Sequence, residues 1–134
     1  MSGVEWIVEA YGCDPAALSN PAKLRALFVR LIEEHALKPV GDPMWHQFPA
    51  AGGYPAGGIT GMCLLAESHL ACHTFPEYGS LCLNIFCCRP RPFWDPTGYL
   101  AREFAATDVH VRQVERSYQA RQRKRAAAGQ EAKG

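Results

Sequence analysis

The residues best suited to chemistry lie between positions 67 and 88. Segment 67–77 reads Glu-Ser-His-Leu-Ala-Cys-His-Thr-Phe-Pro-Glu, and a thiol follows at Cys88. Ser68 comes directly after a glutamate, and His73 stands five positions further on. Hydroxyl, imidazole, carboxylate and thiol groups carry out nucleophilic attack and proton transfer in proteins. The segment is therefore the candidate site of a covalent reaction.

One reaction that needs such a set is the making of a carbonyl from the chain itself. Decarboxylation of an amino acid leaves a carbanion, and a carbonyl that forms a Schiff base with the substrate amine is the electron sink. No unmodified side chain offers such a carbonyl. A serine can generate one by attacking the preceding peptide carbonyl, because the resulting ester eliminates to dehydroalanine, which hydrolyses to a pyruvoyl group. This route requires a strained turn, an oxyanion donor and a base.

The neighbouring sequence offers candidates for these partners. Ser68 lies between two apolar strand segments, where a strained turn is expected. His69 and His73 share a strand face by the period of two, with only Ala71 between them. Thr60 would offer a hydroxyl from the adjacent strand if segments 59–66 and 69–75 pair.

Two assignments stay open at this level. Cys87 would replace Cys88 as the relevant thiol if a β-bulge shifted the register of the strand. His46 is as suited to a structural role as to lining a pocket. Taken alone, Ser68 would be an ordinary turn serine and Cys88 a small buried apolar residue.

The flanking sequence predicts the elements that position these groups. Asn20 caps a helix that starts at Pro21 and fades between His35 and Leu37, and a second helix runs from Asp95 or Thr97 to about Ala106. Segment 59–66 is apolar at nearly every position, which predicts burial on both of its faces. Strands are predicted over 4–11, 44–48, 59–66, 69–75, 80–87 and from Val109 onward.

This outline predicts an α+β two-layer sandwich in the order β-α-β-β-α-β, with helices on one face of an antiparallel sheet. The other sheet face then needs cover, which a second copy would supply. Residues 1–118 are predicted to form the domain. Residues 119–134, which hold four basic residues between Arg121 and Arg125, are predicted to be a disordered tail.

The bulk properties exclude several other classes. The chain has 134 residues and a net charge of +1, which does not favour a nucleic-acid partner. It shows neither a signal-peptide pattern nor an apolar run of membrane-spanning length, so a cytoplasmic protein without a membrane partner is expected. Its six cysteines form no C-x-x-C pair, which favours free thiols over a disulfide framework or a metal site.

The sequence from Glu67-Ser68-His69 to His73-Thr74-Phe75-Pro76-Glu77 resembles the self-cleaving segment of the prokaryotic S-adenosylmethionine decarboxylases, which typically reads ESH and then HTWPE. The resemblance covers most of residues 4–118. It implies cleavage between Glu67 and Ser68, with Ser68 becoming the pyruvoyl cofactor.

The resemblance also implies roles for five further residues. His73 matches the histidine of self-processing, and Thr60 falls where the family usually has a serine that assists it. Cys88 matches the proton donor to the decarboxylated carbon. Glu77 matches the carboxylate that binds the ribose hydroxyls, and Phe48 resembles an aromatic that stacks on adenine.

The implied reaction converts S-adenosyl-L-methionine to S-adenosyl 3-(methylthio)propylamine and carbon dioxide for spermidine biosynthesis, in a homodimer or larger homo-oligomer. Four residues depart from the family pattern: Phe75 replaces tryptophan, Asn84 aspartate, Arg89 glycine and Glu5 histidine. These changes keep two alternatives open. One is a pyruvoyl-dependent ornithine or arginine decarboxylase, and the other is an uncleaved, non-enzymatic paralogue.

Overall fold

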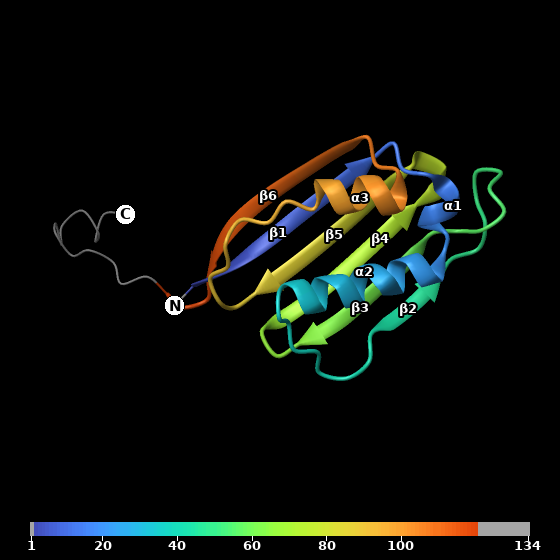
Figure 1. Ribbon diagram of the computed structural model, residues 1–134. Coiled ribbons are helices and arrows are strands. Elements are labelled where there is room, and N and C mark those ends of the chain that lie inside the picture. Colours follow the sequence, from blue (N-terminus) through green and yellow to red (C-terminus); the bar gives the residue numbers. More distant parts are fainter. Residues whose placement is uncertain (1, 121–134) are drawn as a thin grey trace, which may run out of the picture.

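The computed structural model describes residues 2–120, which form one sheet with helices packed on it (Figure 1). Residue 1 and residues 121–134 of the predicted tail 119–134 lie outside the described part. The strands are β1 (Ser2–Tyr11), β2 (Met44–Gln47), β3 (Ile59–Leu65), β4 (Ser68–Phe75), β5 (Ser80–Cys87) and β6 (Asp108–Ser117). The helices are α1 (Pro15–Leu18), α2 (Pro21–Glu34), the 3-10 turn η1 (Pro76–Tyr78) and α3 (Thr97–Phe104).

The six strands form one antiparallel sheet in the order β2-β3-β4-β5-β1-β6. Helices α2 and α3 lie across the same face of this sheet (Figure 1). The N-terminal strand β1 is inserted between β5 and the edge strand β6, so residues from both ends of the sequence pair at one edge of the sheet. The predicted α+β class with helices on one face is confirmed.

The core forms because apolar residues recur with a period of two on the strands and at helical spacing on α2. The Asn20 side chain accepts a hydrogen bond from the Ala22 N–H and Pro21 opens α2, as the sequence predicts. Residues Leu24, Leu27, Phe28 and Leu31 of α2 are buried against Trp6, Leu70, Leu83 and Ile85 of the strands, and Leu100 and Phe104 of α3 complete the core.

Two expectations differ from the structure. The chain places four strands between α2 and α3 rather than the two of the simpler order. The prediction that segment 59–66 is buried on both faces is wrong: Met62 and Leu64 are 42% and 59% exposed, whereas Ile59, Cys63 and Leu65 are buried. The reason is that helices cover only one sheet face, and in a single chain the other face stays open.

This open face, called here the uncovered face, carries an unusual share of apolar side chains. Met62, Leu64, Phe75 and Val114 are each at least 37% exposed on it. It also carries His69 and His73, because the buried residues Leu70 and Cys72 alternate with them along β4. Among residues 2–120, no helix combines the length and the apolar character that a membrane crossing requires.

Candidate active site

The turn before Ser68 is the most strained point of the described backbone near the predicted chemistry. Leu65 pairs with Ser68 across β3 and β4, so Ala66 and Glu67 form a two-residue connection. Ser68 has φ 144°, a value that residues with a side chain rarely adopt. Holding a non-glycine residue there costs about 1–3 kcal/mol, which the surrounding structure must supply. The predicted strained turn is therefore present at the predicted serine.

The peptide carbonyl before Ser68 has a hydrogen-bond donor in place. The backbone N–H of Cys88 donates to the Glu67 carbonyl oxygen at 2.7 Å. That oxygen would take the negative charge if the Ser68 hydroxyl attacked the Glu67 carbonyl carbon. A donor at 2.7–3.1 Å is the geometry by which oxyanions are stabilised. The Cys88 peptide is itself held, because the Tyr118 hydroxyl donates to the Cys88 carbonyl at 3.0 Å.

Glu67 is buried although it is charged in its ordinary state. Its exposed fraction is 6%, and its Oε1 atom has no hydrogen-bond partner among the described residues. A buried polar atom without a partner is destabilising. The Glu67–Ser68 peptide bond is thus flanked by two unfavourable features. The unpartnered Glu67 oxygen lies on one side and the strained Ser68 backbone on the other.

The structure distinguishes the two candidate thiols. Strand β5 pairs with β4 without a shift in register, from Phe75 opposite Ser80 to Ser68 opposite Cys87. Cys87 points into the core and is fully buried, and this burial raises the pKa of its thiol. Cys88 is half-buried and follows the alternation of Asn84 and Phe86 toward the uncovered face. Cys88 is therefore the thiol with access to the surface beside Ser68.

A second group of predicted residues gathers at the other end of β4. Thr60 pairs with His73 across β3 and β4, and Thr60 Oγ1 lies 3.0 Å from His73 Nδ1. Both residues line a cleft of about 290 Å³ together with Phe48 and Glu77. Glu77 lies in η1, and a Cβ on Gly52 would come within 2.8 Å of the Glu77 Cβ, so segment 49–58 closes over this cleft. The structure thus brings together Phe48, Thr60, His73 and Glu77.

The two groups do not meet within one chain. Ser68 and His73 are separated by five residues of extended β4, which is about 17 Å at the rise of a strand. Glu67, Ser68 and Cys88 therefore form one half-site, and Thr60, His73, Phe48 and Glu77 form the other.

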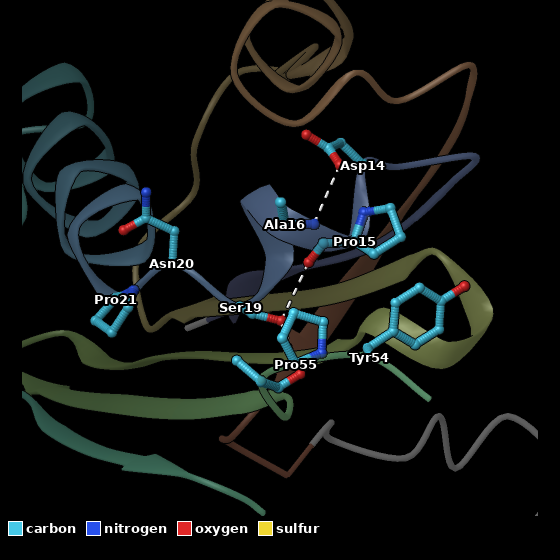
Figure 2. A pocket seen from close by; sticks show the side chains of 9 residues that line it. Asp14, Pro15, Ala16, Ser19, Asn20, Pro21, Tyr54 and Pro55 are labelled. Atoms are coloured by element: carbon cyan, nitrogen blue, oxygen red, sulfur yellow. Dashed lines mark hydrogen bonds between the residues drawn. The ribbon is translucent and has the colours of Figure 1, made fainter. Parts of the chain in front are cut away.

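A larger cleft, of about 660 Å³, holds none of the predicted residues (Figure 2). Asp14, Pro15 and Ser19 line it from α1 and its flanks, and Tyr54 and Pro55 line it from segment 49–58. Figure 2 shows Pro55 beside Ser19, the residue that follows α1. The Ser19 hydroxyl donates to the Ala56 carbonyl at 3.2 Å, which ties that segment to the helix.

Sequence reasoning did not assign a role to a network that borders the first half-site. His69 Nε2 lies 2.9 Å from Asn84 Oδ1, and Asn84 Nδ2 donates to Glu5 Oε2 at 2.5 Å. Arg116 forms an ion pair with the same Glu5. Burial alone would raise the pKa of Glu5, but the hydrogen bonds from Asn84 and Arg116, with the charges of Arg116 and His69, lower it overall. The departures at Glu5 and Asn84 are a signal of this network in the sequence.

The sequence model of the S-adenosylmethionine decarboxylase family matches residues 4–117. The chain belongs to the S-adenosylmethionine decarboxylase family. Three similar proteins are each named S-adenosylmethionine decarboxylase proenzyme. That of Moorella thermoacetica is 33% identical over 82% of this chain and 83% of its own length. That of Acetivibrio thermocellus is 34% identical over 82% and 84%, and that of Pyrococcus furiosus 29% over 85% and 78%.

A crystal structure described as the adenosylmethionine decarboxylase of Aquifex aeolicus VF5 has the same fold. It superposes with a TM-score of 0.65 over 90% of this chain and 97% of that chain, at 23% identity. Membership of the S-adenosylmethionine decarboxylase family agrees with the fold and with the strained serine turn.

Proposed function

We propose that this protein is a pyruvoyl-dependent S-adenosylmethionine decarboxylase that makes its own cofactor by cleaving the chain between Glu67 and Ser68. It converts S-adenosyl-L-methionine to S-adenosyl 3-(methylthio)propylamine and carbon dioxide, for spermidine and polyamine biosynthesis in the cytoplasm. The observation that carries the proposal is the Ser68 backbone at φ 144°, next to a peptide carbonyl held by the Cys88 N–H.

Self-cleavage follows from these contacts. The Ser68 Oγ attacks the Glu67 carbonyl carbon, and the Cys88 N–H stabilises the negative charge that develops on the oxygen. The hydroxyl proton passes to the Ser68 nitrogen, so breaking the C–N bond gives an ester and a free amine, which relieves the strained backbone. Removal of the Ser68 α-proton then expels the Glu67 carboxylate and leaves dehydroalanine. Addition of water and loss of ammonia complete the change, so the products are fragments 1–67 and 68–134.

The residues of the first half-site fit a pyruvoyl group at position 68. When formed, its carbonyl supplies the electron sink for decarboxylation. The Cys88 thiol lies on the uncovered face, one residue beyond the strand partner of Ser68. It can hold a proton there, and a proton is what the carbon that has lost carbon dioxide must receive.

The second half-site supplies the remaining groups from another copy of the chain. Two copies packed with their uncovered faces together and their β4 strands antiparallel would place His73 and Thr60 of one near Ser68 of the other. His73 then acts as the base for the Ser68 α-proton, and the Thr60 hydroxyl, 3.0 Å from it, orients the ring. Threonine retains the hydroxyl of the serine that the family usually has at this place.

Burial considerations favour the same arrangement. Apolar side chains that cover one sheet face, such as Met62 and Leu64, mark an interface when they are contiguous. The cleft beside His73, at about 290 Å³, is small for a nucleoside substrate on its own, as expected of a site that needs a second wall. Glu77 would accept hydrogen bonds from the ribose hydroxyls in it, and Phe48 would stack on the adenine.

The activity is tested by supplying the cleaved protein with S-adenosylmethionine, ornithine or arginine and measuring carbon dioxide and the amine product. Release of carbon dioxide from S-adenosylmethionine alone is expected. Activity on ornithine or arginine alone would replace the proposed substrate, and a cleaved protein inactive on all three would contradict the assignment.

Subunit complementation tests the shared site. Ser68→Ala and His73→Ala chains should each stay uncleaved when produced alone. When they are produced together, the Ser68→Ala chain lends its His73 and the His73→Ala chain should be cleaved. A mixture that remains whole, or a His73→Ala chain that cleaves alone, would refute this arrangement.

A further inference from the structure

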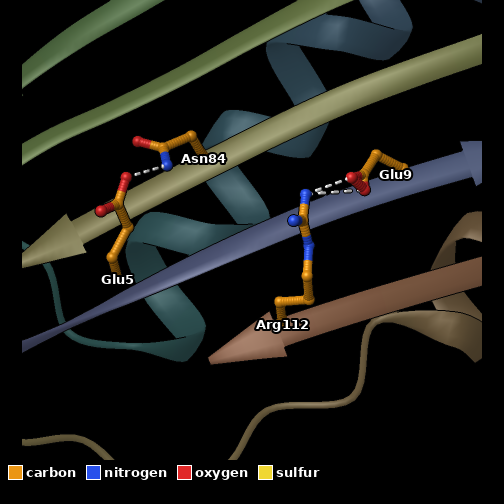
Figure 3. Close-up of polar contacts among 4 residues, drawn as sticks. All are labelled: Glu5, Glu9, Asn84 and Arg112. Carbon is orange, nitrogen blue, oxygen red and sulfur yellow. Dashed lines mark hydrogen bonds and ion pairs between the residues drawn. The ribbon is translucent and has the colours of Figure 1, made fainter. Parts of the chain in front are cut away.

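Four side chains form a continuous polar relay on the uncovered face beside the cleavage turn. Each comes from a different strand: His69 from β4, Asn84 from β5, Glu5 from β1 and Arg116 from β6. The contacts run from His69 Nε2 to Asn84 Oδ1 at 2.9 Å, from Asn84 Nδ2 to Glu5 Oε2 at 2.5 Å, and from Arg116 to the other Glu5 oxygen. Figure 3 shows the Asn84 amide nitrogen directed at the Glu5 carboxylate.

The chemistry of these groups determines the direction of every hydrogen bond. An ionised carboxylate only accepts, so Asn84 must direct its NH2 group to Glu5. Its carbonyl oxygen then faces His69 and can only accept, so His69 Nε2 must carry a proton. Whenever the imidazole is neutral, its single proton is therefore on Nε2 and Nδ1 is bare. The relay therefore sets the tautomer as well as the orientation of His69.

Among the described contacts, the hydrogen bond to Asn84 is the polar contact that holds the His69 side chain. Leu64 faces His69 across β3, and Phe86 faces it across β5 with ring centroids 5.9 Å apart. The Arg116 guanidinium carbon lies over the same Phe86 ring, 4.9 Å from its centroid. The charged groups of the relay lie on more distant strands: Glu5 is on β1 and Arg116 is on β6, and the two pair with each other.

His69 directly follows the residue that must be held in an unfavourable conformation. On the other side of Ser68, the Glu67 carbonyl is held by the Cys88 N–H. A residue at φ 144° relaxes unless the chain is fixed on both sides of it. The contact of His69 with Asn84 supplies the second fixed point.

We propose that Asn84 is a positioning residue for self-cleavage: it holds His69 in place as the Nε2-protonated tautomer, and thereby keeps the Glu67–Ser68 bond in its reactive geometry. This inference rests on the proposed self-cleavage at Ser68. With glutamate at position 5, an amide is required at position 84, because a carboxylate there would face Glu5 and could not donate to it.

Four variants of the full chain test the proposal through the rate of self-cleavage. Asn84→Ala and Asn84→Asp should each slow cleavage by about tenfold or more, the effect of losing roughly one hydrogen bond at the strained turn. The double variant E5Q/N84D exchanges the amide and the carboxylate, so every contact of the relay can form again, and its rate should recover to near that of the natural chain. Arg112→Gln is the matched control, because it breaks the neighbouring ion pair with Glu9 (Figure 3) without touching His69.

Imidazole ¹⁵N spectra of the uncleavable Ser68→Ala chain provide a readout independent of cleavage. At a pH where the ring is neutral, His69 should show a protonated Nε2 and a bare Nδ1, and Asn84→Ala in that background should give a tautomer mixture. A neutral ring protonated at Nδ1 in the parent, an unchanged spectrum in the variant, or cleavage of Asn84→Ala at the rate of Arg112→Gln would overturn the proposal. If the double variant stays as slow as Asn84→Asp, the relay is equally refuted. A natural chain that never cleaves would instead reject the proposed function, and the spectra would still decide whether Asn84 fixes the tautomer of His69.

Discussion

Replacing Ser68 by glycine rather than alanine should make the uncleaved protein more stable. Both variants lack the hydroxyl, so neither can cleave, and the two differ only in how the backbone tolerates φ 144° at this position. Alanine retains a strain of about 1–3 kcal/mol, which glycine does not have. Glycine loses about 0.4–1 kcal/mol because its unfolded chain is more flexible. The free energy of unfolding of the Ser68→Gly variant should therefore exceed that of Ser68→Ala by about 1 kcal/mol.

The assay is urea unfolding of the two variants at the same chain concentration, since a dimer would make the midpoint depend on concentration. The dependence of the unfolding free energy on urea concentration should have the same slope in both variants. In a separate thermal unfolding measurement, a gain of about 1 kcal/mol should raise the melting temperature by roughly 3–6 °C for a domain of this size. Equal stability, or an alanine variant that is the more stable, would mean that the Ser68 backbone is not strained. Strain could not then contribute to cleavage. If the strain is released in the transition state, about 2 kcal/mol accelerates cleavage by roughly thirtyfold.

Three further predictions concern single side chains. Folding lowers the pKa of Glu5, so the ionised carboxylate stabilises the protein above its ordinary pKa, and this contribution is lost as the pH falls through the lowered pKa. The urea midpoint of the natural protein should therefore fall between about pH 6 and pH 3, and it should fall less in the Glu5→Gln variant. Burial raises the pKa of Cys72 to about 12, so mass spectrometry should find it unlabelled by iodoacetamide in the folded protein and labelled after unfolding. Cys88→Ser keeps the backbone N–H, so it should still cleave while losing most decarboxylation, measured by fragment formation and carbon dioxide release.

Local features of the fold could be predicted from the sequence, because their causes are local. The start of α2 follows from the Asn20 cap and Pro21, and the buried face of β1 follows from the alternation that places Trp6 inside. The two-sided burial predicted for segment 59–66 failed, since an apolar strand with one face open has the same composition as a strand buried on both faces.

The candidate site shows a similar division. The family resemblance implied Cys88 as the thiol near Ser68 and left Cys87 open, and the regular register between β4 and β5 places both cysteines beside Ser68. The relay from Asn84 to Glu5 could not be predicted, since it depends on β1 entering the sheet between β5 and β6. Short-range patterns do not contain that long-range pairing. Likewise, the short sequence spacing of Ser68 and His73 does not show that the two residues lie far apart. Their separation follows from β4, which is one unbroken strand between them.

The most direct test of the account is the intact mass of the purified protein under denaturing conditions, with the Ser68→Ala chain as control. Cleavage predicts two fragments, 1–67 and 68–134. The second should carry a blocked N-terminus whose mass corresponds to the loss of ammonia and the gain of water at residue 68, and the control should remain whole. A single full-length mass for the natural chain would contradict self-cleavage and would leave an uncleaved, non-enzymatic member of the family as the better description.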